Sequence, residues 1–247
     1  MQPYRWHPLI RGPLTVLLLA LAVPTGAVDF TPLRARMVEE ITVEVRLTRD
    51  ELGRPALDER VVQVLSTVPR HEFVPDSERA NAYDNRPLPI GEGQTISQPY
   101  IVAVMTDLLE LKPDQVVFEL GTGSGYQAAV LAGLVRQVYT MEIIPALGDR
   151  ARQTLQRLGY HNVEVRVGDG YYGWEEHAPF DAIVVTAAAD HIPPPLIRQL
   201  KPGGRMIIPV GSGFLIQQLL LITKADDGTL RTRALLPVRF VPLTGGR

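Results

Sequence analysis

Acidic side chains and glycines follow three successive apolar runs of this chain. Glu119 and the glycine-rich residues 121–125 (GTGSG) come after the first run, Glu142 ends the second, and Asp169 follows the third between two glycines. A carboxylate at the end of a strand can accept hydrogen bonds from both hydroxyls of a ribose, and one in a turn can accept from the exocyclic amine of adenine. Each carboxylate alone also has a structural explanation, as a helix N-terminal charge or a turn former. Their joint placement favours a pocket for a ligand that contains adenosine.

The glycine-rich run, residues 121–125, narrows the class of ligand. Glycine permits positive φ angles and lets a ligand approach the backbone closely. An apolar helix expected at residues 128–135 would offer the N–H groups of its N-terminus to a polar ligand. The spacing is GxGxG, whereas the dinucleotide fingerprint is GxGxxG. A nucleotide-like ligand is therefore expected, and NAD is not favoured.

A parallel sheet would bring these residues together. Apolar strand-like runs alternate with helix-like segments, which is typical of a parallel sheet covered on both faces, with ligands beyond the carboxyl ends of the strands. Strands are expected at residues 116–118, 137–143, 162–167, 180–186 and 205–210, helices at 146–158 and 193–200, and further extended segments at 215–224 and 230–243. The predicted fold is an α/β, Rossmann-like, doubly wound, mostly parallel sheet with C-terminal antiparallel strands.

The residues before this sheet are expected to form N-terminal helices and a loop. Charged and apolar residues at helical spacing predict helices at residues 31–50 and 57–65. Residues 83–99 are rich in proline, glycine and small polar residues, which predicts an ordered loop rather than a helix or central strand. Long loops of this kind are often functional. A helix is expected after it, at residues 100–111.

The first 29 residues have the pattern of a secretory signal. Arg5 and Arg11 precede an apolar run at residues 14–23, and small residues follow at 24–27. The run is shorter than the about 20 residues that span a bilayer, so no stable membrane span is expected. An apolar extension is the structural alternative. We divide the chain into this extension (1–29) and a single domain (30–247), in which residues 30–112 form the helical lobe and loop and residues 113–247 the sheet.

Composition argues against several kinds of function. The chain has 247 residues, of which 45% are hydrophobic, and a formal net charge of -2. It therefore fits one α/β domain and has no basic footprint for nucleic acid. Cysteine is absent, which removes disulfides, thiolate nucleophiles and cysteine metal sites. The five histidines are scattered, and no closely spaced pair predicts a catalytic metal.

Several motifs between residues 57 and 244 resemble those of the protein-L-isoaspartate O-methyltransferase family. They are PLPIGEGQTISQP (87–99), ELGTGSGY (119–126), GDG (168–170), PFDAI (179–183), LKPGG (200–204) and RFVPL (239–243). The glycine-rich motif is shared by many S-adenosylmethionine-dependent enzymes, so it identifies only the class. The TIS run at residues 95–97 is specific to the family and decides the resemblance.

The resemblance implies methyl transfer from S-adenosylmethionine to the free α-carboxylate of an L-isoaspartyl residue in a damaged protein or peptide. In the family, the ester collapses without the enzyme to a succinimide, which hydrolyses partly to normal aspartate. The resemblance implies that Ser97 is the active-site residue. The residues expected to bind the acceptor are Thr95, Ile96, Ser97 and Thr186, and residues 83–99, which hold the first three, are called the acceptor loop. Those expected to bind the cofactor are Glu119, Gly121, Thr122, Gly123, Ser124, Gly125, Glu142, Asp169 and Gly170.

This reaction agrees with the lack of a paired acid and base in the motifs. A carboxylate is ionised at neutral pH, so no general base is required. A site that excludes water and aligns the reacting atoms would do most of the catalysis. Ser97 is then expected to position the carboxylate by a hydrogen bond, and it could also cap the helix that follows.

Three alternatives remain open at this point. The first is a methyltransferase for a small-molecule nitrogen or oxygen, the second an NAD-dependent oxidoreductase, and the third an exported binding protein without catalysis. The family pattern favours the cytoplasm, where S-adenosylmethionine is made, and damaged proteins as partners. We also expect a monomer that binds no nucleic acid. The signal-like start favours export to the periplasm.

Overall fold

The computed structural model describes residues 1–2, 28–212 and 215–245. The signal-like residues 5–27 therefore lie outside the described residues, and the predicted signal stays a prediction. Among the described residues, no helix combines the length and apolar character that crossing a membrane would need.

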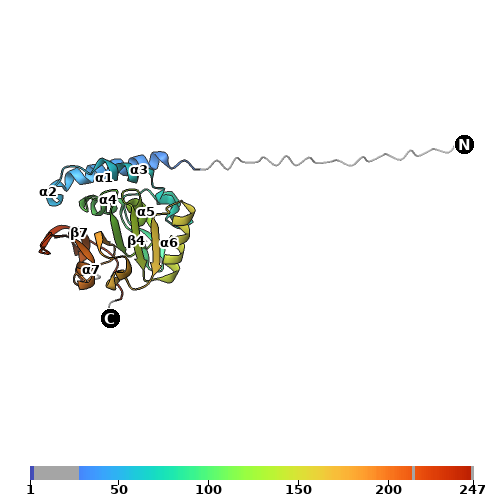
Figure 1. The fold of residues 1–247 in the computed structure, drawn as a ribbon. Coiled ribbons are helices and arrows are strands. Elements are labelled where there is room, and N and C mark those ends of the chain that lie inside the picture. Colours follow the sequence, from blue (N-terminus) through green and yellow to red (C-terminus); the bar gives the residue numbers. More distant parts are fainter. Residues whose placement is uncertain (3–27, 213–214, 246–247) are drawn as a thin grey trace.

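A seven-stranded sheet forms the centre of the described part of the chain (Figure 1). The strands are β3 (Val116–Leu120), β4 (Gln137–Glu142), β5 (Val163–Val167), β6 (Phe180–Val185), β7 (Leu200–Val210), β8 (Gln217–Lys224) and β9 (Leu230–Val238). Their order is β5-β4-β3-β6-β7-β8-β9. The strands from β5 to β7 are parallel, and β8 and β9 continue the sheet in antiparallel pairing. The predicted doubly wound sheet with antiparallel C-terminal strands is confirmed.

The strand order reverses between β3 and β6, and this reversal sets the place of the site. From β3 the chain proceeds outward through β4 and β5, then returns to pair β6 with the other edge of β3. In open α/β sheets, ligands bind beyond the carboxyl ends of the strands at such a switch point. The glycine-rich residues 121–125, called the glycine turn, follow β3, and Thr186 follows β6.

Helices cover both faces of this sheet. Alternate strand residues point to opposite faces, and both faces carry apolar side chains that have to be buried. Val117 and Val184 join one apolar core, whereas Phe118 and Ile183 join the other. The first core receives α4 (Pro99–Leu108), α5 (Tyr126–Ala132) and α6 (Pro145–Arg157), and the second receives α7 (Pro194–Gln199). Such two-sided burial explains the nearly continuous apolar runs of the parallel strands.

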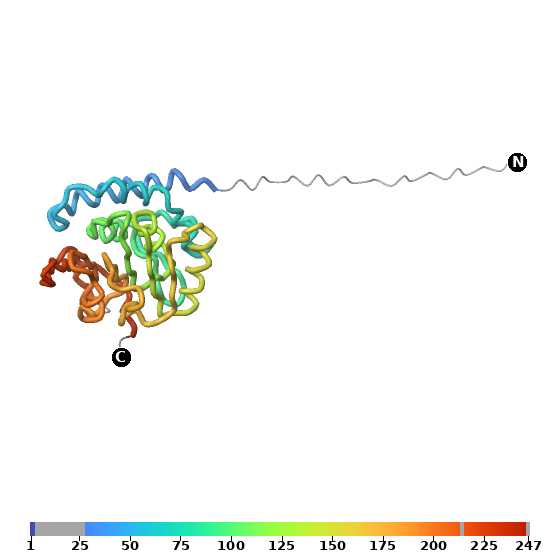
Figure 2. The backbone as a smooth tube through the Cα atoms, viewed as in Figure 1, coloured from blue at the N-terminus to red at the C-terminus, as the bar shows by residue number. Residues whose placement is uncertain are grey.

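The N-terminal helices form a further layer outside α4 and α5. They are α1 (Thr31–Leu47), α2 (Arg49–Leu52) and α3 (Glu59–Thr67), and they lie along one side of the molecule (Figures 1 and 2). Met37 and Ile41 of α1 and Leu65 of α3 are buried in the first core. The helical lobe thus packs over the sheet's own helices, while its predicted boundary near residue 112 stays a prediction.

Three local predictions differ from the structure. The single helix expected at residues 31–50 is divided at Thr48, where φ is -105° and ψ is 18°. The acceptor loop contains a short hairpin of β1 (Leu88–Gly91) and β2 (Gln94–Ile96), although its composition predicts a loop. Strand β7 begins at Leu200 and not at 205, because a register shift against β6 accommodates the KPGG segment within the strand.

Candidate active site

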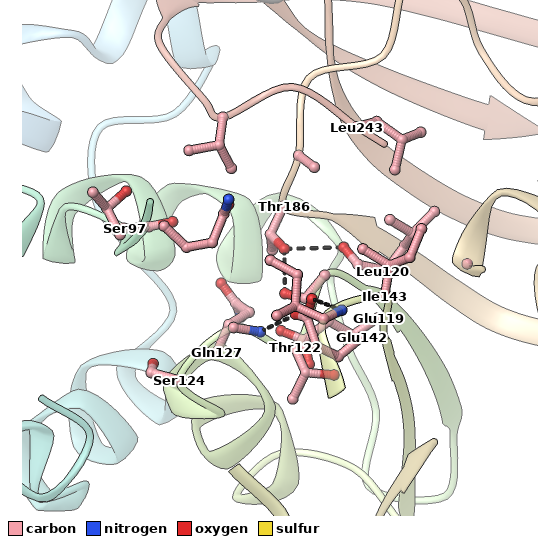
Figure 3. Close-up of a pocket in the computed structure, with 18 of the residues that line it drawn as sticks. Ser97, Glu119, Leu120, Thr122, Ser124, Gln127, Glu142, Ile143, Thr186 and Leu243 are labelled. Carbon is pink, nitrogen blue, oxygen red and sulfur yellow. Dashed lines mark hydrogen bonds between the residues drawn. The ribbon is translucent and has the colours of Figure 1, made fainter. Parts of the chain in front are cut away.

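Two neighbouring pockets open beyond the carboxyl ends of the strands. The space at the inner pocket amounts to about 780 Å³ and that at the outer pocket to about 920 Å³, both including open solvent at their mouths. The inner pocket is lined by strand ends, the glycine turn and α5, and the outer by α4, the acceptor loop and the C-terminal segment. The residues common to both linings are Thr95, Ser97, Thr186 and Val241. Figure 3 shows Ser97 on the helical side of the inner pocket, and Glu119, Leu120 and Glu142 at its strand ends.

The glycine turn leaves the end of β3 in a conformation that needs glycine. Gly121 has φ of 96°, and a Cβ there would lie 2.5 Å from Thr186 Oγ1. The Thr186 hydroxyl donates to the carbonyls of Leu120 and Gly121 at 2.9 and 2.6 Å. Thr186 lines both pockets, as expected of an acceptor-binding residue. Its hydroxyl proton, however, is already used to hold the turn.

Glu142 supports the turn from the end of β4. The carboxylate oxygens accept from the N–H of Gly123 at 2.7 Å and from the N–H of Ile144 at 2.9 Å. Glu142 is only 5% exposed and lines the inner pocket. Because a carboxylate has about four acceptor positions, Glu142 keeps the capacity to accept from a ligand. The structure thus brings it to the pocket where a ribose was expected.

The hydroxyl residues of the turn are bonded within the protein. Thr122 Oγ1 lies 2.6 Å from Thr140 Oγ1, and Ser124 Oγ accepts from the N–H of Tyr126 at 3.2 Å. Thr122 and Ser124 line the inner pocket. Gly125, with φ of 88°, occupies the N-cap position of α5. The Tyr126 N–H, at the start of α5, is therefore engaged by the protein itself.

Glu119 places a buried carboxyl group in the inner pocket wall. The residue is 0% exposed, and neither side-chain oxygen has a hydrogen-bond partner among the described residues. Burial raises the pKa of Glu119 to about 8; the Thr140 hydroxyl opposes the rise, and the negative charge of Glu142 adds to it. Thr140 lies close enough to act on the charge, but its hydroxyl is bonded to Thr122. A cation in the pocket would lower this pKa and supply the missing partner.

Of the two predicted adenine-binding residues that follow β5, only one lines the inner pocket. Gly170 belongs to the inner lining, but Asp169 does not. The Asp169 carboxylate accepts from the N–H of Tyr171 at 3.0 Å, and a Cβ on Gly245 would lie 2.4 Å from its Oδ1. The C-terminal segment therefore packs against Asp169. The predicted adenine contact of Asp169 stays a prediction.

The acceptor loop delivers Ser97 to the junction of the two pockets. Ile96 pairs with Leu88 across the hairpin and is 3% exposed, whereas Thr95 is exposed and lines both pockets. Ile96 thus anchors the loop in the core beside Ser97. Within the described residues, the Ser97 hydroxyl makes no hydrogen bond to the protein.

The structural alternative for Ser97, capping of α4, is not found. Gln98 occupies the N-cap position and gives no side-chain cap. Instead, Asn85 Oδ1 accepts from the N–H of Tyr100 at 3.0 Å. An earlier residue of the same loop therefore accepts from an N–H group at the start of α4, and the Ser97 hydroxyl can bond a ligand in the pocket.

Several residues that line the inner pocket were not predicted from the sequence, among them Gln127 and the C-terminal segment. Gln127 of α5 lines the inner pocket and donates from Nε2 to Thr106 Oγ1 at 2.9 Å. The C-terminal segment, residues 241–244, lines the same pocket, and it is fixed by Leu243 N–H donating to the Ala188 carbonyl at 2.7 Å. The RFVPL motif was a signal for this segment, although spacing alone did not place it at the site.

No group of three or more histidine or acidic side chains suitable for a metal ion occurs among the described residues.

Comparisons with known proteins agree on one family. The family model of protein-L-isoaspartate(D-aspartate) O-methyltransferase matches residues 48–247. Protein-L-isoaspartate O-methyltransferase 2 of Polaromonas sp. strain JS666 is 69% identical over 211 residues, which cover 85% of this chain and 100% of that protein. Protein-L-isoaspartate O-methyltransferase 1 of Cupriavidus necator is 61% identical, over 99% of this chain and 95% of that protein.

Solved structures show the same fold. A protein-L-isoaspartate O-methyltransferase structure has a TM-score of 0.75 and 28% identity, over 86% of this chain and 66% of that chain. A crystal structure from Plasmodium falciparum, in complex with S-adenosyl-L-homocysteine, has a TM-score of 0.71 and 24% identity, over 88% of this chain and 99% of that one. The family match and the similarity to these relatives show that the chain belongs to the protein-L-isoaspartate O-methyltransferase family of S-adenosylmethionine-dependent enzymes.

Proposed function

We propose that this protein moves a methyl group from S-adenosylmethionine to the α-carboxylate of L-isoaspartyl residues in damaged proteins and peptides. The methyl ester then collapses to a succinimide. The observation that carries the proposal is the junction where Thr95, Ser97 and Thr186 belong to both pockets. A group transfer needs donor and acceptor held in line where their sites meet. Family membership indicates the methyl donor and the class of acceptor, and the junction of the two pockets is where we expect the transfer to occur.

The inner pocket suits a donor that carries positive charge and a ribose. Glu119 offers two carboxyl oxygens that have no partner in the described part of the chain, so a cationic ligand would satisfy it. Glu142 would accept from the ribose hydroxyls, and Asp169 with Gly170 would hold the adenine. The turn at residues 121–125 would receive the amino acid portion of the donor.

The chain's own residues have little proton chemistry to perform. When bound, the donor supplies a sulfonium methyl group that passes to a carboxylate oxygen and leaves its bonding electron pair on sulfur. The acceptor is already ionised at neutral pH, so no base has to remove a proton. Ser97 donates a hydrogen bond that orients the carboxylate, and it is not a nucleophile. The pocket walls keep water from the developing ester.

The outer pocket receives the acceptor peptide. Ile96, buried at 3% exposure, fixes the backbone that presents Ser97. Thr95 borders both pockets and shapes the entrance between them. Thr186 contributes from the opposite wall, chiefly by holding the glycine turn through its hydroxyl.

Paired peptides test this function. A peptide with one L-isoaspartyl residue and the same peptide with normal aspartate are incubated with radiolabelled S-adenosylmethionine, and base-labile methyl ester is counted. We expect ester only on the isoaspartyl peptide. Equal labelling of both peptides would contradict the acceptor assignment, and labelling of neither, with methylation of a small amine or alcohol in the same assay, would favour a small-molecule methyltransferase.

The same proposal includes a monomer that works in the cytoplasm, where its donor is made. Light scattering during gel filtration measures the mass, and a dimer would contradict the first part. Mass spectrometry of the mature N-terminus tests the second. A start near Val28 would indicate processing and export to the periplasm instead.

A further inference from the structure

Arg70 is a fully buried cation behind the acceptor loop. It lies in the short 3-10 turn Arg70–Glu72 that follows α3, and it is 0% exposed. Burial lowers the pKa of Arg70 to about 10, so the guanidinium is still charged at neutral pH. None of the function described above uses this residue.

The contacts of Arg70 join three parts of the molecule. Its Nε donates to the Ala82 carbonyl at 2.8 Å, directly before the acceptor loop. Its Nη2 donates to the Ser97 carbonyl, also at 2.8 Å, near the end of that loop. Its guanidinium carbon lies 4.7 Å from the ring centre of Tyr126, the first residue of α5. One side chain thus contacts both ends of the loop and the helix that follows the glycine turn.

Ion pairing does not explain the burial of this charge. In the described part of the chain Arg70 forms no ion pair, and the nearby Glu72 is bonded to Arg79 at 2.7 Å and to Arg157 at 2.6 Å. A buried charge without a carboxylate partner is costly to desolvate. Its planar fork can, however, donate to two carbonyls at once and stack on an aromatic ring, which a lysine ammonium cannot do.

We propose that Arg70 is a positioning residue, which fixes the Ser97 backbone so that the Ser97 hydroxyl meets the acceptor carboxylate. This inference rests on the proposed role of Ser97. Arg70 does not touch either substrate. It acts by holding the Ser97 carbonyl, while its contact with Tyr126 sets the loop at a fixed distance from the donor side of the site.

Kinetics of Arg70→Lys, alone and with Ser97→Ala, test the proposal. The measurements are kcat and KM for an isoaspartyl peptide, the affinity for S-adenosylhomocysteine by calorimetry, and Tm. Because a displacement of about 1 Å can cost up to about 100-fold in rate, we expect Arg70→Lys to lower kcat by about 10- to 100-fold. The affinity should change by less than about threefold, since Arg70 does not line the inner pocket.

The double variant separates positioning from general destabilisation. If Arg70 acts through Ser97, the lysine substitution should cost less than about threefold in kcat when Ser97 is already alanine. Equal costs in both backgrounds, or a normal kcat for folded Arg70→Lys, would overturn the proposal. A normal kcat for Ser97→Ala alone would instead overturn the proposed role of Ser97.

Two further variants keep the test interpretable. Arg157→Lys is the matched control, because Arg157 is bonded to Glu72 and does not reach the acceptor loop; its kcat should equal that of the parent protein. If Arg70→Lys does not fold, Arg70→Gln removes the buried charge and keeps one donor. The same loss of kcat with retained affinity is then expected, and retained kcat would overturn the proposal.

Discussion

The glycine turn (residues 121–125) and the acceptor loop (residues 83–99) face the same site but are held in different ways. The backbone of the turn is bonded to side chains that follow or end neighbouring strands: the Gly123 N–H donates to Glu142, and the Gly121 carbonyl accepts from Thr186. The loop is held largely by side chains from the helical lobe, such as Arg70 on the Ser97 carbonyl. The donor side is therefore held by the ends of the sheet strands, and the acceptor side by the helical lobe.

Gly121→Ala should have the largest effect, because it attacks the turn's backbone directly. The added Cβ would lie 2.5 Å from Thr186 Oγ1 at a φ of 96°. Backbone strain and overpacking together should lower the free energy of unfolding by about 3 kcal/mol. Binding of S-adenosylhomocysteine should be lost. Chemical denaturation and calorimetry measure the two effects.

Gly93→Ala is the matched control in the hairpin of the acceptor loop. Gly93 also has a positive φ of 69°, but a Cβ there would meet nothing within 4 Å. Only the left-handed backbone cost of about 1 kcal/mol is expected. Equal losses of stability in the two variants would contradict the close approach between the turn and Thr186.

Glu142→Ala should weaken binding of S-adenosylhomocysteine without introducing a steric clash. The substitution removes the acceptor of the Gly123 and Ile144 N–H groups and the proposed ribose contact. Affinity for S-adenosylhomocysteine should fall by roughly 1–3 kcal/mol, with a smaller loss in Glu142→Gln, which keeps one acceptor oxygen. Unchanged affinity by calorimetry would count against the ribose assignment.

Glu119→Gln should change how stability depends on pH. Burial raises the pKa of Glu119 to about 8, so the native state keeps this proton while the unfolded chain loses it near pH 4.5. The contribution of Glu119 to the stability of the cofactor-free protein therefore falls as pH rises between these values. Glu119→Gln removes this loss, and its advantage should grow by about 1.4 kcal/mol from pH 6 to pH 7. Parallel stability profiles of the two proteins would refute the raised pKa.

Asn85→Ala should have the smallest of these effects, on the acceptor side. Asn85 caps α4 by accepting from Tyr100 N–H and donates to Glu44 Oε2 at 2.7 Å. Loss of the cap should lower the free energy of unfolding by about 1 kcal/mol. Donor affinity should not change. A loss of donor affinity as large as that of Glu142→Ala would show that the two regions are not held independently.

The fold was largely predictable because its strands carry strong local patterns. Continuous apolar runs bounded by glycine and proline identified the parallel strands. The errors lie where tertiary contacts decide the backbone. The strand was expected to begin at residue 205, but β7 already pairs with β6 at Leu200, and residues 201–204 lie at a register shift within the strand. The hairpin β1–β2 was missed because its strands are short and rich in residues typical of loops.

The site was predictable where one short segment makes it. The glycine turn and Glu142 follow from spacing, and the structure brings residues 121–124 and Glu142 to the inner pocket, whereas Gly125 does not line it. Gln127 and residues 241–244 could not be placed there, since only the folded chain brings them to the strand ends. Arg70 was not predicted either, because a lone arginine after a helix usually lies on a solvated surface.

Ser97→Ala tests the division between the two regions most directly. The measurement compares kcat for an isoaspartyl peptide with the affinity for S-adenosylhomocysteine in the same preparation. The account predicts that kcat falls by about 10- to 100-fold while the affinity changes by less than about twofold. A parallel loss of both quantities, or an unchanged kcat, would contradict the claim that the turn holds the donor and the loop positions the acceptor.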